Sequence, residues 1–589
     1  MAFPKLRVPP VSRQMVDVFK GYNHNLRIGD GEFFDMKNMT SDYYPVLSPR
    51  GKRGVHASSD EFTGIIAKDS LCYVDGSEFV INEYRVDMEL NDEPKQLISM
   101  GAYVIIMPDK KWINTLDLTE FGNIEAEVQT EAAVSFTMCK LDGTDYSSDI
   151  PTEEPSEPAN MDMWIDISTE PHSLKQWSES AKMWVSVGTT YVKIASAGVG
   201  AAFEKYDGIT IEGLTGVLTD NVTGETIEDT KDLAALEGAA VVWDKGDDYI
   251  VVVGILDVTR TITDQITISR KMPTMDFIVE SGNRLFGCRY GEAANGEVVN
   301  EIYASKLGDF KNWSCYMGLS TDSYTASCGT DGQFTGAITH LGYPLFFKEN
   351  CVHKVYGNYP ANFQIQDTAC RGVQKGCEKS LAIVNETLFY KARSGVCAYD
   401  GSLPTEVSYV FGNEAYSDAV GGAHGNKYYI SMKDAEGNYN LFVYDVAKGM
   451  WHREDALQVD AFCSCRGEMY AIAGGQILEL LGTGTPDDAP VEWMVQTGDI
   501  GISSPDMKYI SRLNVRMSMD VGSEVRFYVQ YDFSEEWEHI CTLASTNLRS
   551  FSIPIRPKRC DHLKLRIEGV GEAKIYSITK TIEQGSDRS

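Results

Sequence analysis

The chain has 589 residues, of which 43% are hydrophobic and 23% are charged, so it is expected to fold around more than one hydrophobic core. It carries 53 Lys and Arg against 85 Asp and Glu, a formal net charge of −32 at pH 7. This balance excludes sequence-independent wrapping of nucleic acid, because such binding needs cationic groups along the phosphates.

The start of the chain predicts no export signal, since residues 1–10 lack the long apolar stretch of a signal peptide. No window approaches the ~18 consecutive apolar residues of a membrane-spanning helix, so no membrane segment is expected. The 13 cysteines are odd in number and include no Cys-x-x-Cys. We therefore expect reduced thiols in a protein made in the cytoplasm.

Residues 29–54, GDGEFFDMKNMTSDYYPVLSPRGKRG, alternate aromatic and polar side chains around turns. This pattern predicts the first strands of a sheet domain rather than a helix. One of these strands is expected to pair with the last repeat, near residues 460–480, because that pairing would cover an exposed sheet edge.

A turn followed by an apolar strand recurs along the chain, whereas helical spacing is rare and is clearest in residues 231–240. The repeated strands contain KDSLCYV, MGAYVIIM, SGNRLFG, LGYPLFF, VNETLFY, HGNKYYIS and RGEMYAIA. Five equivalent positions are separated by 60, 43, 40 and 41 residues, and they are Leu285, Leu345, Leu388, Tyr428 and Met469.

A second apolar strand follows in several repeats, as CVHKVYG, GVCAYDG, NLFVYDVAKGMW and GQILELLG. A period of ~40–45 residues built from four short strands is typical of β-propeller blades. The sequence therefore predicts an all-β fold with a β-propeller of about six or seven blades. A β-sandwich with regular turns remains the alternative for part of this pattern.

The repeat is interrupted and then ends, which divides the chain into four predicted parts. Residues 1–124 are expected to form the N-terminal part of the propeller, and residues 125–272, with an acidic Pro-rich loop at 141–160, an inserted β-barrel-like domain. Residues 273–485 would complete the propeller. Beyond a turn-rich linker at 481–490, alternating apolar and polar residues predict a C-terminal β-sandwich over 486–589.

Catalytic and ligand-binding motifs are missing from the sequence: it has no P-loop, His-Glu-x-x-His, Gly-x-Ser-x-Gly or zinc spacing. No catalytic, cofactor-binding or metal residue is assigned, and no enzyme is expected. Paired carboxylates for glycosidic cleavage stay open, because the pairing of two acids is spatial. Trp313 and Trp451 each follow a polar turn and are expected to pack between blades rather than to stack on sugars.

Four segments of the chain resemble tail proteins of bacteriophages, above all the tail nozzle or packaged-DNA stabilisation proteins of short-tailed phages. These segments are residues 38–54, 300–313, 342–357 and 380–401, and the similarity covers about 25–120 and 275–480. The chain departs from the family by PRGKRG in place of a plain Pro-Gly turn and by the 125–272 insertion. The signature residues are Tyr44, Pro45, Pro49, Arg50, Gly51, Ser305, Asp309, Trp313, Gly357, Gly401 and Trp451.

The resemblance implies a non-enzymatic virion protein at the head-tail junction, made in the host cytoplasm. It would form a ring of six copies that contacts portal, adaptor and other tail proteins, retains packaged DNA, and lets it pass during ejection without sequence-specific binding. An acidic channel agrees with this, because carboxylates repel phosphates. Two alternatives remain: a receptor-binding, adhesin-like tail protein, and a propeller hydrolase that acts on glycans.

Overall fold

The structure is a computed structural model that describes residues 11–131, 133–147, 149–293, 296–482, 489–502, 507–532, 534–544 and 548–584. The middle of the predicted linker at 481–490 and the predicted boundary at 485 lie outside these residues. The expected all-β fold is confirmed, because strands make up nearly all regular structure. The helical elements of the described part are α1 (Lys231–Ala234), η1 (Pro360–Asn362), η2 (Glu378–Ser380) and η3 (Tyr409–Phe411).

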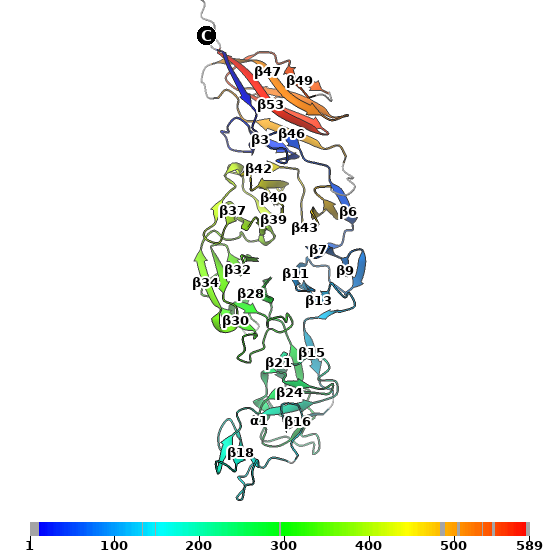
Figure 1. Ribbon diagram of the computed structural model, residues 1–589, viewed down its shortest axis with the longest axis vertical. Coiled ribbons are helices and arrows are strands. Elements are labelled where there is room, and N and C mark those ends of the chain that lie inside the picture. The colour runs from blue at the N-terminus through cyan, green and yellow to red at the C-terminus, as the bar shows by residue number, and fades with distance from the viewer. Residues whose placement is uncertain are drawn as a thin grey trace, which may run out of the picture.

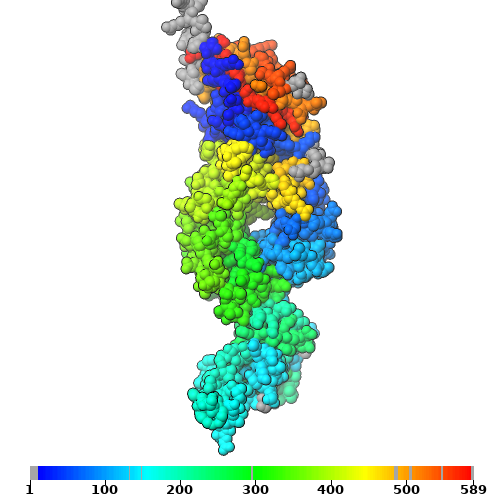
Figure 2. Space-filling view, viewed as in Figure 1, coloured from blue at the N-terminus to red at the C-terminus, as the bar shows by residue number. Residues whose placement is uncertain are grey.

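Seven four-stranded antiparallel sheets lie around a common centre and form what we call the sheet ring (Figure 1). In most steps around the ring, the first strand of one sheet contacts the first strand of the next. One series of contacts runs from β7 through β11 and β27 to β31, and a second runs from β35 through β39 and β43 back to β7. The short η2 contacts both β31 and β39 and so bridges the remaining step. Figure 2 shows an opening through the middle of the ring. This arrangement is consistent with a β-propeller.

The sheets of the ring consist of the following strands. The first two are β7 (Phe62–Ala67), β8 (Leu71–Asp75), β9 (Glu78–Ile81), β10 (Tyr84–Asp87), and β11 (Gln96–Met100), β12 (Tyr103–Met107), β13 (Lys111–Asn114), β14 (Phe121–Asn123). The next two are β27 (Phe277–Ser281), β28 (Arg284–Glu292), β29 (Val298–Ala304), β30 (Tyr324–Ser327), and β31 (Gly336–His340), β32 (Tyr343–Lys348), β33 (Cys351–Tyr356), β34 (Gln364–Ala369). The last three are β35 (Ala382–Val384), β36 (Thr387–Ala392), β37 (Gly395–Tyr399), β38 (Thr405–Glu406); β39 (Ser417–His424), β40 (Lys427–Lys433), β41 (Tyr439–Asp445), β42 (Met450–Arg453); and β43 (Ala461–Cys465), β44 (Glu468–Ala473), β45 (Gln476–Glu479), β6 (Gly54–Ser58).

The predicted repeat corresponds to one strand per sheet. The five equivalent positions Leu285, Leu345, Leu388, Tyr428 and Met469 lie in β28, β32, β36, β40 and β44, the second strands of five successive sheets. All five side chains are fully buried. The second repeated element forms the third strands β33, β37, β41 and β45. The period is therefore confirmed, because each sheet buries the same strand between its neighbours.

The last sheet takes its outermost strand from the other end of the chain. β6 pairs antiparallel with β45, and Leu478 lies opposite Val55. An N-terminal strand thus pairs with residues 460–480, but β6 follows the stretch 29–54 that is predicted to supply it and shares only Gly54 with it. It covers the edge that β45 would otherwise expose.

Most of the N-terminal stretch does not join the ring, which corrects the prediction for residues 29–54 and for 1–124 as a whole. β1 (Val11–Val16) pairs with β53 (Ala573–Gln584), and β3 (Glu32–Lys37) pairs with β46 (Glu492–Thr497). These strands complete two C-terminal sheets that share one apolar core, to which Phe33 contributes. Alternating apolar and polar side chains predict a strand, but they do not determine its partner. The partner is the strand beside which the apolar face becomes buried.

The other strands of this C-terminal sheet pair are β2 (Gly21–Tyr22), β47 (Lys508–Met519), β48 (Glu524–Tyr531), β49 (Glu538–Leu543), β50 (Arg549–Ile553), β51 (Arg559–Cys560) and β52 (Leu563–Val570). A small hairpin of β4 (Met39–Thr40) and β5 (Ser48–Pro49) lies between the sheet pair and the ring.

The segment between β14 and β27 forms three sheets of its own, which Figure 1 shows as a separate body beside the ring. Two of them share one core, in which Phe136, Ile194, Ile211 and Ile250 are fully buried. Their strands are β15 (Ala126–Gln129), β21 (Gly208–Glu212), β22 (Gly238–Val241), β26 (Thr267–Arg270), and β16 (Val134–Cys139), β20 (Tyr191–Ala195), β23 (Asp244–Lys245), β24 (Tyr249–Val253), β25 (Arg260–Ile262). The third sheet has β17 (Met163–Asp166), β18 (Ser173–Ser178) and β19 (Met183–Ser186). We call this body the inserted segment.

Helical spacing in residues 231–240 predicts a longer helix than the one found. The helix α1 ends at Ala234, and β22 begins at Gly238. None of the described helices is long and apolar enough to cross a membrane.

Candidate functional site

The candidate site lies in the inserted segment, in a cleft of about 540 Å³ between α1 and the loop that joins β17 to β18. The loop contributes Glu170 and His172, α1 contributes Lys231 and Asp232, and Asp257 follows β24. We call this space the carboxylate cleft.

Two carboxyl groups and one guanidinium form the centre of the cleft. Arg260 Nε donates a hydrogen bond to Asp232 Oδ2 at 2.9 Å, and Arg260 Nη2 donates to Asp257 Oδ1 at 3.1 Å. Asp232 Oδ1 accepts a further hydrogen bond from the backbone N–H of Leu233 at 2.9 Å. One cation thus fixes the position of both acids.

The two acids differ in exposure. The Asp232 side chain is 3% exposed and the Asp257 side chain 31%, while Arg260 is 13% exposed. Asp257 also lines a smaller cavity of about 160 Å³ on its other side, next to Asp145 and Tyr146. Asp257 is therefore the more accessible member of the pair.

The environment moves the two pKa values in opposite directions. Burial, and after it a hydrogen bond with Asp257, raises the pKa of Asp232 above its ordinary value. Burial works in the same direction on Asp257, but the hydrogen bond from Asp232 and the charge of Arg260 outweigh it and lower its pKa. Asp232 therefore holds a proton more strongly than Asp257, as expected for two carboxyls that share one site.

Two further carboxylates stand at the rim of the cleft. Asp229 Oδ1 accepts a hydrogen bond from the Lys231 backbone N–H at 3.2 Å. Glu170 Oε1 lies 3.5 Å from Lys231 Nζ, and both of these side chains are exposed. The cleft therefore combines a paired acid and base with carboxylates that solvent can reach.

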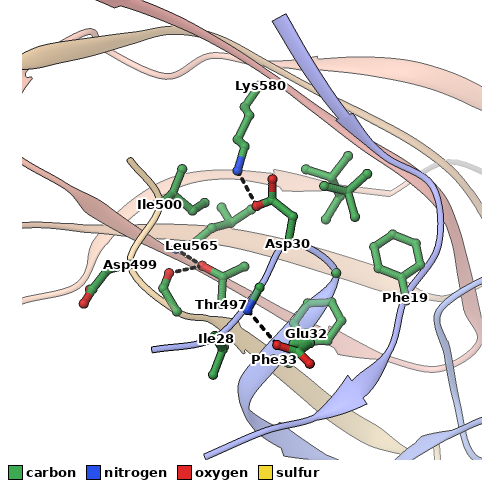
Figure 3. A pocket seen from close by; sticks show the side chains of 15 residues that line it. Phe19, Ile28, Asp30, Glu32, Phe33, Thr497, Asp499, Ile500, Leu565 and Lys580 are labelled. Carbon is green, nitrogen blue, oxygen red and sulfur yellow. Dashed lines mark hydrogen bonds and ion pairs between the residues drawn. The ribbon is translucent and has the colours of Figure 1, made fainter. Parts of the chain in front are cut away.

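The cavity in Figure 3 is different in character. It lies between β3 and the C-terminal sheets and has a volume of only about 50 Å³. Asp30 accepts a hydrogen bond from Lys580 Nζ at 2.6 Å at its edge, and Phe19 and Phe33 form its apolar wall. Such a space holds about one or two waters, so we interpret it as a packing gap beside the N-terminal strands.

The signature residues of the sequence lie in the scaffold and are absent from the described lining of the carboxylate cleft. Trp313 and Trp451 are 2% and 1% exposed, and their indole N–H groups donate to Phe310 O and Val407 O. Both pack in the apolar core, as predicted. Ser305 Oγ accepts from the Leu285 N–H, and Asp309 Oδ1 accepts from the Lys311 N–H.

The remaining signature residues shape turns. Gly357 and Gly401 adopt φ values of +109° and +107°, where a side chain would be strained. Arg50 Nε donates to Asn38 Oδ1 at 2.9 Å, next to the exposed Gly51. Pro49 lies in β5, and Tyr44 and Pro45 precede it at the surface.

Sequence reasoning missed Asp232, Asp257 and Arg260. Asp232 lies in the one stretch singled out for helical spacing, Asp257 lies in the connection between β24 and β25, and Arg260 is the first residue of β25. With 85 acids in the chain, nothing local distinguishes these two. Among the described residues, no group of three or more His, Cys, Asp and Glu is arranged to hold a metal ion.

No protein-family model and no curated protein matches this chain. Among solved structures it is similar to the exo-β-1,3-galactanase of Phanerochaete chrysosporium with β-1,3-galactotriose, at 10% identity and a TM-score of 0.20, over 51% of this chain and 94% of that one. It is also similar to the same enzyme with galactose, at 10% identity and a TM-score of 0.20, over 51% of this chain and 95% of that one. A third similar structure is a glycoside hydrolase family 43 arabinoxylan arabinofuranohydrolase from Bacillus subtilis with cellotetraose. Its identity is 8% and its TM-score 0.15, over 51% of this chain and 94% of that one.

These similarities contradict the prediction of a non-enzymatic tail nozzle, because the solved structures found are glycoside hydrolases. The prediction is therefore corrected, and the third alternative, a glycan hydrolase, is taken up below as a proposal. At this identity and TM-score the similarity carries no argument for an activity, so the function has to be argued from the carboxylate cleft.

Proposed function

We propose that this chain is a hydrolase that cleaves glycosidic bonds in the carboxylate cleft, with Asp232 and Asp257 as its central acid pair. The observation that supports this is the pair itself: two carboxyls held by Arg260 in a cleft of about 540 Å³, with their pKa values moved apart. Pairs of this kind mark acid and base roles.

The reaction class follows from the side chains of the cleft. Acyl transfer would use a nucleophilic hydroxyl or thiol, and no Ser, Thr or Cys is found among the described lining residues. Cleavage of an acetal needs only a carboxylic acid and carboxylates. The side chains of the cleft therefore favour glycosides over esters or amides.

Asp232 is the proton donor in this proposal, because burial raises its pKa above the ordinary value of a carboxyl. As the bond between the anomeric carbon and the leaving oxygen breaks, that oxygen takes the proton from Asp232. The ionised Asp257 then stabilises the positive charge that develops on the sugar ring. Arg260 positions both carboxyls.

The attacking water needs another base. Carboxyls that hydrogen-bond to each other are closer than the ~5–9.5 Å that separates the two acids of glycosidases. Asp229 and Glu170 are the other carboxylates of the cleft. We propose that one of them accepts the proton of the water, whose oxygen bonds to the anomeric carbon.

The test is release of reducing ends from a panel of polysaccharides by the full chain. Asp257→Asn and Asp232→Asn are expected to lower kcat by about 10²-fold or more. Glu212→Gln, an exposed acid on β21 outside the cleft, is the matched control and should retain full activity. If no polysaccharide is cleaved, or if Asp257→Asn cleaves as fast as the native chain, the proposal is wrong.

We propose further that the sheet ring is a seven-bladed β-propeller in which β6 completes the last blade. The two-sheet part of the inserted segment would be its barrel-like domain, and the C-terminal sheet pair would be a β-sandwich. The phage-tail resemblance, the receptor-binding alternative, the virion location, and the six-copy ring with portal and tail partners stay predictions.

A further inference from the structure

We propose that a groove next to the carboxylate cleft is a stacking subsite for neutral sugar residues, so that the substrate is an extended polysaccharide. This inference rests on the proposed function of the cleft. The groove has a volume of about 470 Å³ and lies between the inserted segment and the ring. Trp243 and Val253 form one wall, and Tyr316 and Met317 form the other. We call it the aromatic groove.

The groove and the cleft are adjacent. Ala235, directly after α1, lines both of them. Asp232 lies on α1 at the cleft side, and Leu236 faces the groove. A chain molecule that passes over α1 can therefore occupy both spaces at once.

Trp243 is held in place by its neighbours and keeps its polar atom available. The ring of Tyr191 packs against the indole at 5.8 Å and an angle of 66°, and the ring of Tyr206 at 6.3 Å and 80°. Trp243 is only half-buried. Within the described part of the chain, its indole N–H has no hydrogen-bond partner, so it can donate to a ligand.

The opposite wall is anchored to the ring. Tyr316 is 54% exposed, and its hydroxyl shares a hydrogen bond with Thr325 Oγ1 at 3.1 Å. A few residues earlier, the buried Asn312 amide donates to Asp207 Oδ1 and accepts from the Gly208 N–H, each at 2.8 Å. Asp207 is in turn paired with Arg270. This network joins the ring loop to the inserted segment.

The chemistry of the lining selects the occupant. Every described residue that lines the groove is uncharged, so neither phosphate nor carboxylate groups of a ligand would find a partner there. The net charge of −32 also disfavours polyanions. Aromatic faces together with an indole N–H and a phenol hydroxyl suit a ligand with apolar faces and hydroxyl edges, which is a neutral sugar ring.

The test measures binding rather than turnover. Cellohexaose and cellobiose, xylohexaose and xylobiose, and the six- and two-residue oligomers of β-1,3-galactan are titrated calorimetrically into the full chain. We expect at least one hexamer to bind tenfold or more tightly than its dimer. Trp243→Ala should abolish that ratio, Trp243→Phe should keep most of it, and Tyr409→Ala, at an exposed aromatic elsewhere on the ring, should leave it unchanged.

Each outcome decides between the two proposals. If no hexamer binds more tightly than its dimer, or if Trp243→Ala keeps the ratio, the groove is not a sugar subsite, and cleavage lost in Asp257→Asn would still support the cleft. If the ratio depends on Trp243 but nothing is cleaved, the groove stands and the hydrolase proposal fails. Should Trp243→Ala not fold, Tyr316→Ala on the exposed loop serves as the second variant.

Discussion

Arg53 Nη1 donates a hydrogen bond to Asp455 Oδ2 at 2.6 Å and so joins residues that are 402 positions apart. Arg53 Nη2 also donates to Glu454 Oε2 at 2.7 Å. Arg53 directly precedes β6, and the two acids directly follow β42. The basic turn PRGKRG, which distinguishes this chain from the family that it resembles, thus ties the entry of the chain into the ring to its last sheets.

Removing this arginine should strongly destabilise the protein. The Arg53 and Glu454 side chains are 8% and 10% exposed, so Arg53→Ala would leave the buried Glu454, among the described cations, with only the more distant Arg50, whose Nε lies 3.9 Å from Glu454 Oε2. We expect a loss of about 3–5 kcal/mol in the free energy of unfolding, measured by urea denaturation. Arg85→Ala, which breaks a pair whose arginine is 48% exposed, should cost no more than about 1 kcal/mol. Equal losses for both variants would contradict the structural role of Arg53.

Stability should decline in acid because of His452. Burial, and after it the charge of Lys427, lowers the pKa of His452 to about 3, whereas a histidine in the unfolded chain titrates near 6.5. Between these values the unfolded state binds a proton that the folded state does not. The free energy of unfolding is therefore highest, as far as His452 is concerned, above about pH 6.5. It falls by on the order of 4 kcal/mol as the pH is lowered toward 3.

The measurement for His452 is the free energy of unfolding at pH 7 and pH 4.5 in the native chain and in His452→Gln. The free energy of unfolding of the variant should fall less between pH 7 and pH 4.5, even if it is already lower than that of the native chain at pH 7. His539→Gln, in which an exposed histidine is replaced, should follow the native chain. Parallel pH profiles for the native chain and His452→Gln would overturn the assignment.

The pH profile of cleavage should be bell-shaped if the proposed function is correct. The acid limb arises when Asp257, whose pKa is lowered, becomes protonated, and the alkaline limb arises when Asp232, whose pKa is raised, ionises. Arg260→Gln should shift both limbs to higher pH, because Arg260 lowers the pKa of Asp232 as well as that of Asp257. An unchanged profile in this variant would remove Arg260 from the site.

Asn312→Ala should weaken the junction between the ring and the inserted segment. The Asn312 side chain is fully buried and forms hydrogen bonds with Asp207 and the Gly208 backbone. Leaving these groups unsatisfied should cost about 1–3 kcal/mol per group, measured by thermal unfolding. Asn221→Ala, at an exposed asparagine of the inserted segment, should change stability by less than about 0.5 kcal/mol. A neutral Asn312→Ala variant would contradict the role of this network.

The sequence by itself determined the strands and their period, because alternation and turn residues act over a few positions. Leu285, Leu345, Leu388, Tyr428 and Met469 show this, since each lies in the second strand of its sheet. The buried positions of Trp313 and Trp451 followed from the same repeat.

Only the tertiary structure decided which distant segments meet. β3 lies in a stretch that the sequence predicts as strand, but it pairs with β46, and β1 pairs with β53, because those sheets have apolar faces to bury. Asp232 and Asp257 are ordinary acids in the sequence, and Arg260 brings them together in the folded chain. Their pKa values depend on burial and on the interaction between the two carboxyls. Both of these causes arise only when the chain has folded.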